Sequence, residues 1–338
     1  MAKMKVAIVS KPGGDFEMTE RDIPTPGPGQ VRVRVLACGI CYSDHLTKDG
    51  VWPGLTFPRS PGHEIAGVID EAGPGVTLWK KGQRVGVGWH GGQDNTCPNC
   101  RRGDFATCVS GRVTGITHDG GYAEYTLAPM EAVAAMPESL DPAEAAPLMC
   151  AGITTFNALR HSGAGPGDLV AVQGIGGLGH LGVQFANKFG YKTVAIGRGP
   201  ENGTLAKKLG AVAYVDSKAT NAAEELQKLG GAKVILATAP NSKSMSELID
   251  GLGPNGKLMV VGAGPDPIEV TPIQLISLRR SIQGWPSGTP SDSEDTLRFA
   301  ERSGVKAMIE RFPFAKVNEG FARMWSGKAE FRVVLTMT

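Results

Sequence analysis

The sequence predicts an α/β chain that combines a β-rich domain with a second domain built on a doubly wound parallel sheet. Three observations predict this. Short β-branched runs alternate with helix-length segments from about residue 168 onward, a glycine-rich turn follows the first of these runs, and the first 150 residues are rich in Gly and Pro. At 338 residues the chain is long enough for about two domains, each with its own core.

The first domain is expected to be irregular and rich in β-structure. Its strand-like runs are "QVRVRVLACG", "EIAGVIDEAG" and "QRVGVGWH", and turn signals such as "TPGPGQ" and "GPGV" separate them. The tail from about residue 290 returns to mixed helix and strand, ends in "EFRVVLTMT", and is expected to pack on this domain. We therefore assign residues 1–151 and 288–338 to one domain and 152–287 to the other.

The second domain shows a regular alternation of strands and helices. Its predicted strands are "DLVAVQG", "KTVAIG", "VAYVD", "KVILAT", "KLMVVG" and "SIQGW". Segments such as "GLGHLGVQFANKFG", "GTLAKKLG" and "NAAEELQKLG" lie between them and have the apolar spacing of helices. Such an alternation favours right-handed crossovers and a parallel sheet with helices on both faces.

The turn after the first of these strands reads "VQGIGGLGHLG" and fits the pattern G-x-G-x-x-G. Gly174 permits a tight turn, Gly176 lets the backbone approach a pyrophosphate, and Gly179 lets the helix lie close to the sheet. Because the pattern stands between a predicted strand and a predicted helix, it favours dinucleotide binding over a merely glycine-rich turn. The predicted cofactor loop comprises Gly174, Gly176, Gly177, Leu178 and Gly179, and we interpret His180 as a helix-start residue.

The segment "DNTCPNCRRGDFATC" contains Cys97, Cys100 and Cys108 in the spacing C-x2-C-x7-C. A short loop with this spacing brings several thiolates onto one tetrahedral ion, and Asp94 could supply a fourth, oxygen ligand. The alternative is a cysteine-containing surface loop without metal. Cys38 and Cys41 form a second C-x2-C, which is compatible with a redox pair or with half of another zinc site.

Charge and hydropathy argue against several partners. The formal net charge of +2 is nearly balanced, so we expect neither a nucleic-acid partner nor a membrane surface partner. The N-terminus lacks the pattern of a signal peptide, and no run reaches the roughly 18 apolar residues of a membrane span. A cytoplasmic protein is expected, and in a reducing compartment its cysteines are metal ligands, catalytic groups or small buried residues rather than disulfides.

Three further stretches, "ACGICYSDH", "PGHE" and "APLMCAGITTF", together with the glycine loop, carry a family resemblance. Over essentially its whole length the chain resembles the zinc-dependent alcohol dehydrogenases of the medium-chain dehydrogenase/reductase superfamily. The resemblance implies that Cys41, His63 and Cys150 hold a catalytic zinc. It further implies that Glu64 is the acidic neighbour able to approach the metal and that Asp44 orients His63.

The same resemblance implies a GroES-like catalytic domain and a Rossmann nucleotide domain, with a structural zinc lobe in the former. The family's lobe carries four cysteines, whereas here Asp94 stands in the first position before Cys97, Cys100 and Cys108. Ser43 stands where the family has the hydroxyl that passes the alcohol proton toward solvent. A relay His often follows five residues after the ligand Cys, but this chain has Leu46 there and His45 one position earlier.

The substrate and cofactor contacts are also implied by resemblance. Thr154 is placed against the nicotinamide and Arg332 near the pyrophosphate. Trp52 and Trp89 occupy positions where relatives acting on primary alcohols carry aromatic pocket walls, and flat walls near a metal favour slim or planar substituents. Either Trp is also compatible with an ordinary core position. Trp285 has no firm place in this scheme.

The expected function is reversible oxidation of primary alcohols, including aromatic or allylic ones, to aldehydes with zinc and NAD or NADP. Gly197 and Arg198 stand where NAD-preferring enzymes usually have a carboxylate, which favours NADP over NAD. A polyol or sugar dehydrogenase of the same superfamily is the second interpretation. A nucleotide-binding sensor with a degenerate site is the third, and a homotetramer is the assembly that the resemblance implies.

Overall fold

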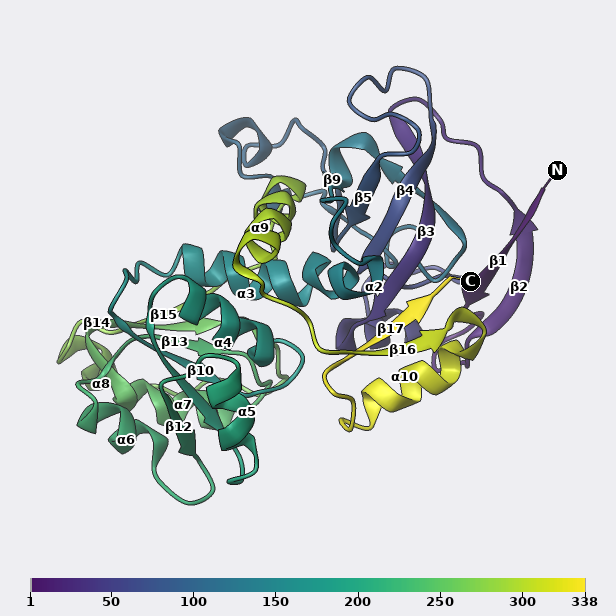
Figure 1. The fold of residues 1–338 in the computed structure, drawn as a ribbon. Coiled ribbons are helices and arrows are strands. Elements are labelled where there is room, and N and C mark those ends of the chain that lie inside the picture. Colours follow the sequence, from purple (N-terminus) through teal and green to yellow (C-terminus); the bar gives the residue numbers. More distant parts are fainter. Residues whose placement is uncertain (1, 338) are drawn as a thin grey trace. The chain divides into compact units, whose positions relative to one another are not determined.

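The computed structural model describes residues 2–337 and divides into two compact units. One unit comprises Met1–Ile153 with Gly288–Thr338, and the other comprises Thr154–Ser287. In Figure 1 the second unit is the largely green α/β layer structure, while the first carries the purple, blue and yellow strands. The C-terminal residues from Gly288 onward thus belong to the first unit.

The second unit contains a sheet of six parallel strands in the order β12-β11-β10-β13-β14-β15. All six predicted runs form these strands. The strands are β10 (Leu169–Gln173), β11 (Lys192–Gly197), β12 (Ala213–Asp216), β13 (Ala232–Ala237), β14 (Leu252–Val260) and β15 (Ser281–Gly284). The order reverses direction after β10, and an open α/β sheet binds ligands at such a switch point.

Helices follow the strands of this unit as the sequence periodicity predicts. They are α4 (Gly179–Lys188), α5 (Asn202–Lys208), α6 (Ala222–Lys228), α7 (Ser242–Leu248) and α8 (Pro272–Ile276). The Asn221 side chain accepts hydrogen bonds from Ala223 and Glu224 at the start of α6, and Asn241 caps α7 similarly, which sets where these helices begin. A buried apolar cluster that includes Val194, Ile235 and Leu258 fills the unit's core.

The first unit is built on a seven-stranded sheet in the order β16-β17-β3-β4-β5-β9, with β8 also paired to β3. Its strands are β3 (Gln30–Ile40), β4 (Ile65–Ala72), β5 (Arg84–Val87), β8 (Tyr125–Pro129), β9 (Val133–Ala135), β16 (Ile309–Pro313) and β17 (Arg332–Thr336). Two smaller sheets pair β1 (Lys3–Ile8) with β2 (Glu17–Asp22), and β6 (His90–Gly92) with β7 (Arg112–Val113).

Helices join and cover these strands. They are α1 (His45–Lys48), α2 (Pro142–Ala145), α9 (Pro290–Ser303) and α10 (Val317–Trp325), and α3 (Ala151–Arg160) begins in this unit and continues into the other. Helix α10 packs on β17 and β3, with Gly320 allowing close approach to Ile40. Since Val333 of β17 pairs with Ile40 of β3, Arg332 and Cys41 lie at the same end of these strands.

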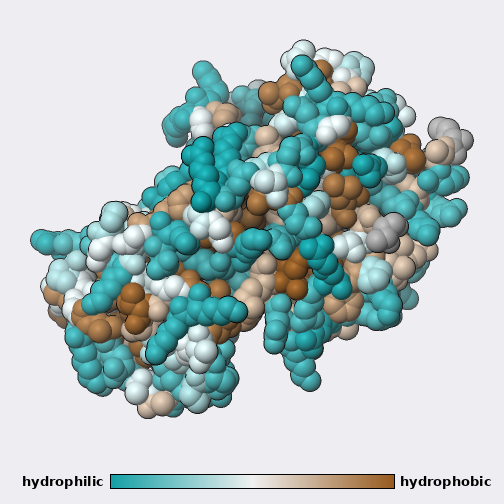
Figure 2. All heavy atoms as spheres, viewed as in Figure 1, coloured by the Kyte–Doolittle hydropathy of each residue, from teal (hydrophilic) through white to brown (hydrophobic). Residues whose placement is uncertain are grey.

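Within residues 2–337, none of the helices combines the length and the apolar character that crossing a bilayer requires. The face drawn in Figure 2 is mostly hydrophilic, and its hydrophobic residues stand in small separate groups.

Candidate metal centres and nucleotide-binding loop

Cys41 directly follows β3 and precedes a 3-10 turn over Tyr42–Asp44. The Asp44 carboxylate accepts a hydrogen bond from the Cys41 backbone N–H at 2.8 Å, and the Asp44 N–H donates to the Cys41 carbonyl at 3.0 Å. This reciprocal pair satisfies the backbone groups at the start of the turn. It fixes the buried Cys41 at the end of a core strand, with the half-buried Ser43 inside the same turn.

His63 and Glu64 lie in the extended segment that leads into β4. The turn before them uses Gly62 at a φ of +100°, which a side chain would make unfavourable. The His63 Nδ1 lies 3.2 Å from the Asp44 Oδ1, whereas its Nε2 is buried without a hydrogen-bond partner among residues 2–337. A buried nitrogen of this kind is costly unless a ligand satisfies it, so Nε2 is the atom available to a metal.

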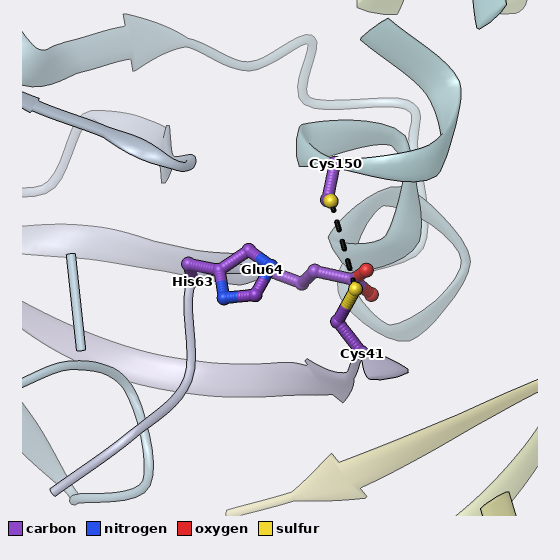
Figure 3. Close-up of side chains that lie close together, drawn as sticks. All are labelled: Cys41, His63, Glu64 and Cys150. Atoms are coloured by element: carbon purple, nitrogen blue, oxygen red, sulfur yellow. Dashed lines mark hydrogen bonds between the residues drawn. The ribbon is translucent and has the colours of Figure 1, made fainter. Parts of the chain in front are cut away.

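Cys150 stands at the end of a short 3-10 segment, immediately before α3. Its Sγ lies 3.8 Å from the Cys41 Sγ, and the donor atoms of Cys41, His63, Glu64 and Cys150 all lie within 4.8 Å of one another. Figure 3 shows these side chains converging from three separate segments of the chain. Two thiolates on one tetrahedral zinc lie about 3.8 Å apart, since each Zn–S bond is about 2.3 Å long, so this donor set fits zinc.

The charges within this cluster influence one another strongly. The hydrogen bond with Cys150 and the nearby His63 lower the pKa of Cys41 well below its ordinary value, while the same contact and burial raise the pKa of Cys150. Burial alone would lower the pKa of His63, but the Asp44 carboxylate and Cys41 raise it well above its ordinary value. The cluster therefore favours the thiolate of Cys41 over that of Cys150, and a cation placed there would stabilise both thiolates.

Glu64 pairs with Arg332 of β17 in a buried ion pair, which the sequence analysis did not foresee. Burial raises the pKa of Glu64 to about 8, although the Arg332 guanidinium opposes that rise. The Oε2 atom of Glu64 is buried without a hydrogen-bond partner among the described residues, and so is the Arg332 Nε. Because an unpaired buried charge is costly, this pair holds the Glu64 carboxylate beside the two cysteines.

Trp89 lies beside His63, and Trp52 lies beside Trp89. The Trp89 ring packs edge to face on the His63 ring with centroids 4.9 Å apart, and Trp52 packs edge to face on Trp89 at 5.9 Å. Both side chains remain partly exposed. A partly open aromatic wall next to a metal cluster is suited to contact a planar substrate group.

The second cluster gathers Asp94, Cys97, Cys100 and Cys108, whose donor atoms lie within 4.8 Å of one another. The Cys97 sulfur accepts a hydrogen bond from the Cys100 N–H and the Cys108 sulfur accepts one from the Asp94 N–H, each at 3.4 Å. Hydrogen bonds from Cys97 and Thr96 hold the pKa of Asp94 well below its usual range. Three sulfurs and one carboxylate at this spacing fit a tetrahedral zinc.

In the second unit, the glycine loop joins β10 to α4 as predicted. Gly174 has a φ of +92°, and a Cβ on Gly179 would lie 1.8 Å from the Gly174 carbonyl oxygen. A Cβ on Gly176 would meet nothing within 4 Å, so the backbone there faces open space. A side chain would thus be strained at Gly174 and would clash at Gly179, and the open backbone at Gly176 suits a pyrophosphate at the start of α4.

Family profiles match both units. The alcohol dehydrogenase GroES-like domain matches residues 27–138, and the zinc-binding dehydrogenase domain matches residues 177–302. The chain belongs to the zinc-type alcohol dehydrogenases of the medium-chain dehydrogenase/reductase superfamily. The predicted pairing of a GroES-like domain with a Rossmann domain is thereby confirmed.

Curated relatives cover nearly the whole of this zinc-type alcohol dehydrogenase. Alcohol dehydrogenase patD of Penicillium expansum is 44% identical over 333 residues, which span 98% of this chain and 97% of the relative. An alcohol dehydrogenase of Geobacillus stearothermophilus is 38% identical over 98% of this chain and 99% of its own length. These shares leave no long segment of either relative without a counterpart here.

Solved structures show the same architecture. A cinnamyl alcohol dehydrogenase of Sorghum bicolor has a TM-score of 0.90 at 30% identity, covering 99% of this chain and 98% of that one. A cobalt- and zinc-bound alcohol dehydrogenase of Pyrobaculum aerophilum has a TM-score of 0.89 at 28% identity over 99% of this chain and 100% of its own. A Helicobacter pylori CAD complexed with NADP(H) has a TM-score of 0.88 at 26% identity over 99% and 98%.

In this zinc-type alcohol dehydrogenase, β11 ends at Gly197 and the exposed Arg198 follows it. A Cβ on Gly197 would lie 2.9 Å from the Tyr214 hydroxyl oxygen, which itself donates to the Gly199 carbonyl at 2.6 Å. The Gly199 N–H donates to the Asp216 carboxylate at 2.8 Å. Tyr214 therefore fills the space beside Gly197, a feature that no motif in the sequence signals.

The remaining predicted residues have diverse positions. His45 lies with its Nδ1 2.7 Å from the Tyr42 carbonyl and its ring against Trp325, and Cys38 is buried outside the four-residue metal cluster. His180 is buried at the start of α4, as a helix-start residue should be. Thr154 lies one turn after Cys150 on α3, and the Trp285 ring stacks on His161 with centroids 4.4 Å apart.

Proposed function

We propose that the chain catalyses the reversible oxidation of primary alcohols, including aromatic and allylic ones, to aldehydes with a nicotinamide cofactor. The observation that carries the proposal is the convergence of Cys41, His63 and Cys150 with an unpartnered His63 Nε2. Zinc held by these residues would supply a Lewis acid for the alcohol oxygen, and a bound nicotinamide would supply the acceptor or donor of the hydride. The chain's own residues would bind and orient the alcohol and transfer its proton.

We assign the proton transfer to Ser43, because its hydroxyl lies in the turn that directly follows Cys41. His45 lies at the next turn of the chain and is only partly buried, so its ring offers a route toward solvent. Asp44 orients His63. Glu64 places a second carboxylate beside the cluster, and its ion pair with Arg332 keeps that carboxylate in place. Arg332 is further proposed to approach the cofactor pyrophosphate as a fixed cation.

We assign the wall of the alcohol site to Trp52 and Trp89. Their edge-to-face packing leaves flat ring surfaces close to His63. A planar substituent on the alcohol carbon would stack there, whereas a branched polyol would leave its hydroxyls facing aromatic carbon. The proposal therefore favours primary alcohols with aromatic or allylic groups over sugars.

We assign the nucleotide to the loop Gly174, Gly176, Gly177, Leu178 and Gly179, with Thr154 against the nicotinamide. NADP is the preferred cofactor in this proposal. Gly197 removes the carboxylate that would repel a 2′-phosphate, and the exposed Arg198 can form charge-assisted hydrogen bonds with that group. The proposed assembly is a homotetramer, which light scattering after size-exclusion chromatography tests.

The experiment mixes the purified protein with NADPH or NADH and benzaldehyde and follows cofactor absorbance, with zinc content measured on the same sample. Turnover that is lost when a chelator removes zinc and restored by added zinc supports the proposal. Quenching of cofactor fluorescence without turnover on benzaldehyde, allylic aldehydes or sugars selects the nucleotide-binding sensor. Faster turnover of polyols than of benzyl alcohol selects the polyol dehydrogenase.

A further inference from the structure

Tyr122 is a fully buried residue that lies against the loop carrying His63. The N–H groups of Gly120, Gly121 and Tyr122 donate to carbonyl oxygens of residues 60, 62 and 61 at 2.8, 2.8 and 3.0 Å. A Cβ on Gly120 would lie 2.2 Å from the Gly62 carbonyl oxygen, so only glycine allows this approach. The backbone of Tyr122 is therefore fixed to the turn that precedes His63.

The ring of Tyr122 has little room to move. It packs edge to face on Phe16 with centroids 5.6 Å apart, and a Cβ on Gly62 would lie 2.5 Å from its Cδ1. Close packing of this kind holds an aromatic side chain in one rotamer. The fixed ring consequently holds the hydroxyl against the carboxylate of Asp44.

The Tyr122 hydroxyl donates to the Asp44 Oδ2 at 2.8 Å. The same Oδ2 accepts from the Cys41 N–H at 2.8 Å, while Oδ1 lies 3.2 Å from both the Gly62 nitrogen and the His63 Nδ1. Each oxygen of this buried carboxylate thus has two partners. The four partners come from three segments that are far apart in the sequence, so Asp44 ties together the turns that present Cys41 and His63.

We propose that Tyr122 is a positioning residue for the centre formed by Cys41, His63 and Cys150. Its hydroxyl holds the Asp44 carboxylate in the orientation that keeps the His63 Nδ1 bound and the Nε2 turned toward the two sulfurs. Without the hydroxyl, Oδ2 retains only the Cys41 N–H, so the carboxylate is held less firmly in the orientation that His63 requires. The inference rests on the proposed function in one respect, namely that this centre holds zinc.

The test is the rate at which zinc passes from the purified enzyme to a chromogenic chelator. The Cys41→Ser variant identifies which kinetic phase of zinc release belongs to this centre, because the variant lacks that phase. Tyr122→Phe keeps the ring and removes only the hydroxyl. It should accelerate this phase by up to about 10- to 100-fold, the loss of metal affinity that follows removal of a direct partner of a metal ligand. Tyr125→Phe, on β8 with its ring facing Arg32, is the matched control and should release zinc at the wild-type rate.

Two further readouts separate positioning from a general loss of stability. The cobalt-substituted Tyr122→Phe should show a shifted visible absorption spectrum, while the metal-free form melts within a few degrees of the metal-free wild type. In a double-mutant cycle, Tyr122→Phe should have little further effect in an Asp44→Asn background, because it acts through that carboxylate.

An active wild-type zinc enzyme whose Tyr122→Phe variant shows unchanged zinc release and an unchanged cobalt spectrum overturns this inference and leaves the proposed function standing. Equal acceleration of zinc release in the Asp44→Asn background also overturns it, since Tyr122 would then act elsewhere. A wild-type protein with no Cys41-dependent zinc phase and no turnover overturns the proposed function, and this inference with it.

Discussion

The Oδ1 atom of Asp94 accepts a hydrogen bond from the Cys97 backbone N–H at 2.8 Å. The same atom accepts one from the Thr96 N–H, also at 2.8 Å. One carboxylate oxygen thus closes the turn that brings the three sulfurs together, and the other is available to a metal. A single residue has two separable roles in this lobe, which substitutions of different kinds can distinguish.

Asp94→Ala should lower the zinc content by about one equivalent per chain and lower the melting temperature by about 5 °C or more. The reason is that a structural ion contributes its binding free energy to the folded state. Turnover measured at low temperature should persist, because Cys41, His63 and Cys150 belong to the other cluster. Elemental analysis and calorimetry check both effects.

Two matched variants separate the roles of Asp94. Asp94→Asn keeps an oxygen that can accept from Thr96 and Cys97 but removes the charged ligand, so it should lose zinc while keeping more stability than Asp94→Ala. Asp94→Cys supplies a fourth thiolate and should keep zinc. Wild-type zinc content and melting temperature in Asp94→Ala would show that Asp94 does not bind the ion.

Cys41→Ser and His63→Ala should each reduce kcat by about a thousandfold or more. Zinc supplies several kcal/mol of stabilisation to the developing charge, and each 1.36 kcal/mol is a factor of ten. Binding of NADPH should change little, since the glycine loop lies in the other compact unit. Fluorescence titration and metal analysis of the same samples check this, and substantial turnover in a variant shown to lack this zinc would contradict the zinc mechanism.

The sequence predicted the roles of residues that lie close together in the chain better than the contacts between distant segments. Gly174, Gly176 and Gly179 follow one another within a single turn, so their spacing alone predicts their roles. The ion pair of Glu64 with Arg332 joins residues 268 positions apart, and no local pattern signals it. The family resemblance named both residues without indicating that they meet.

The same limit applies to Tyr122 and Tyr214. Tyr122 reaches Asp44 across 78 positions, and only the preceding pair of glycines indicates that another backbone approaches there. Tyr214 contacts Gly197 from the neighbouring parallel strand β12. The strand register that pairs Gly197 with Asp216 places Tyr214 beside Gly197. Such contacts depend on strand register, which the motif alone does not determine.

His118 should make stability depend on pH. Its Nε2 is buried without a hydrogen-bond partner among the described residues, and burial, followed by the charges of Arg112 and Arg59, lowers its pKa to about 4 while Asp119 opposes the shift. The unfolded chain therefore binds a proton before the folded one does. The free energy of unfolding should fall as the pH falls from about 6.5 toward 4, by up to about 3 kcal/mol from this residue.

The check is to compare wild type with His118→Gln by urea unfolding at several pH values across this range. The variant cannot take up the proton, so its stability should fall less steeply with decreasing pH. Parallel stability curves for wild type and His118→Gln would contradict the prediction.

Cofactor preference should depend on Arg198 and on the contact between Gly197 and Tyr214. Arg198→Ala should lower kcat/KM with NADPH by about ten- to a hundredfold and leave NADH almost unchanged, because charge-assisted hydrogen bonds contribute about 1.5–3 kcal/mol each. Gly197→Asp alone should displace Tyr214, whose hydroxyl oxygen lies 2.9 Å from the new Cβ, and should impair both cofactors. Adding Tyr214→Ala makes room for the carboxylate, so the double variant should prefer NADH, with Tyr214→Ala alone as the control. A wild-type preference for NADH that Arg198→Ala leaves unchanged would show that Arg198 does not bind the 2′-phosphate.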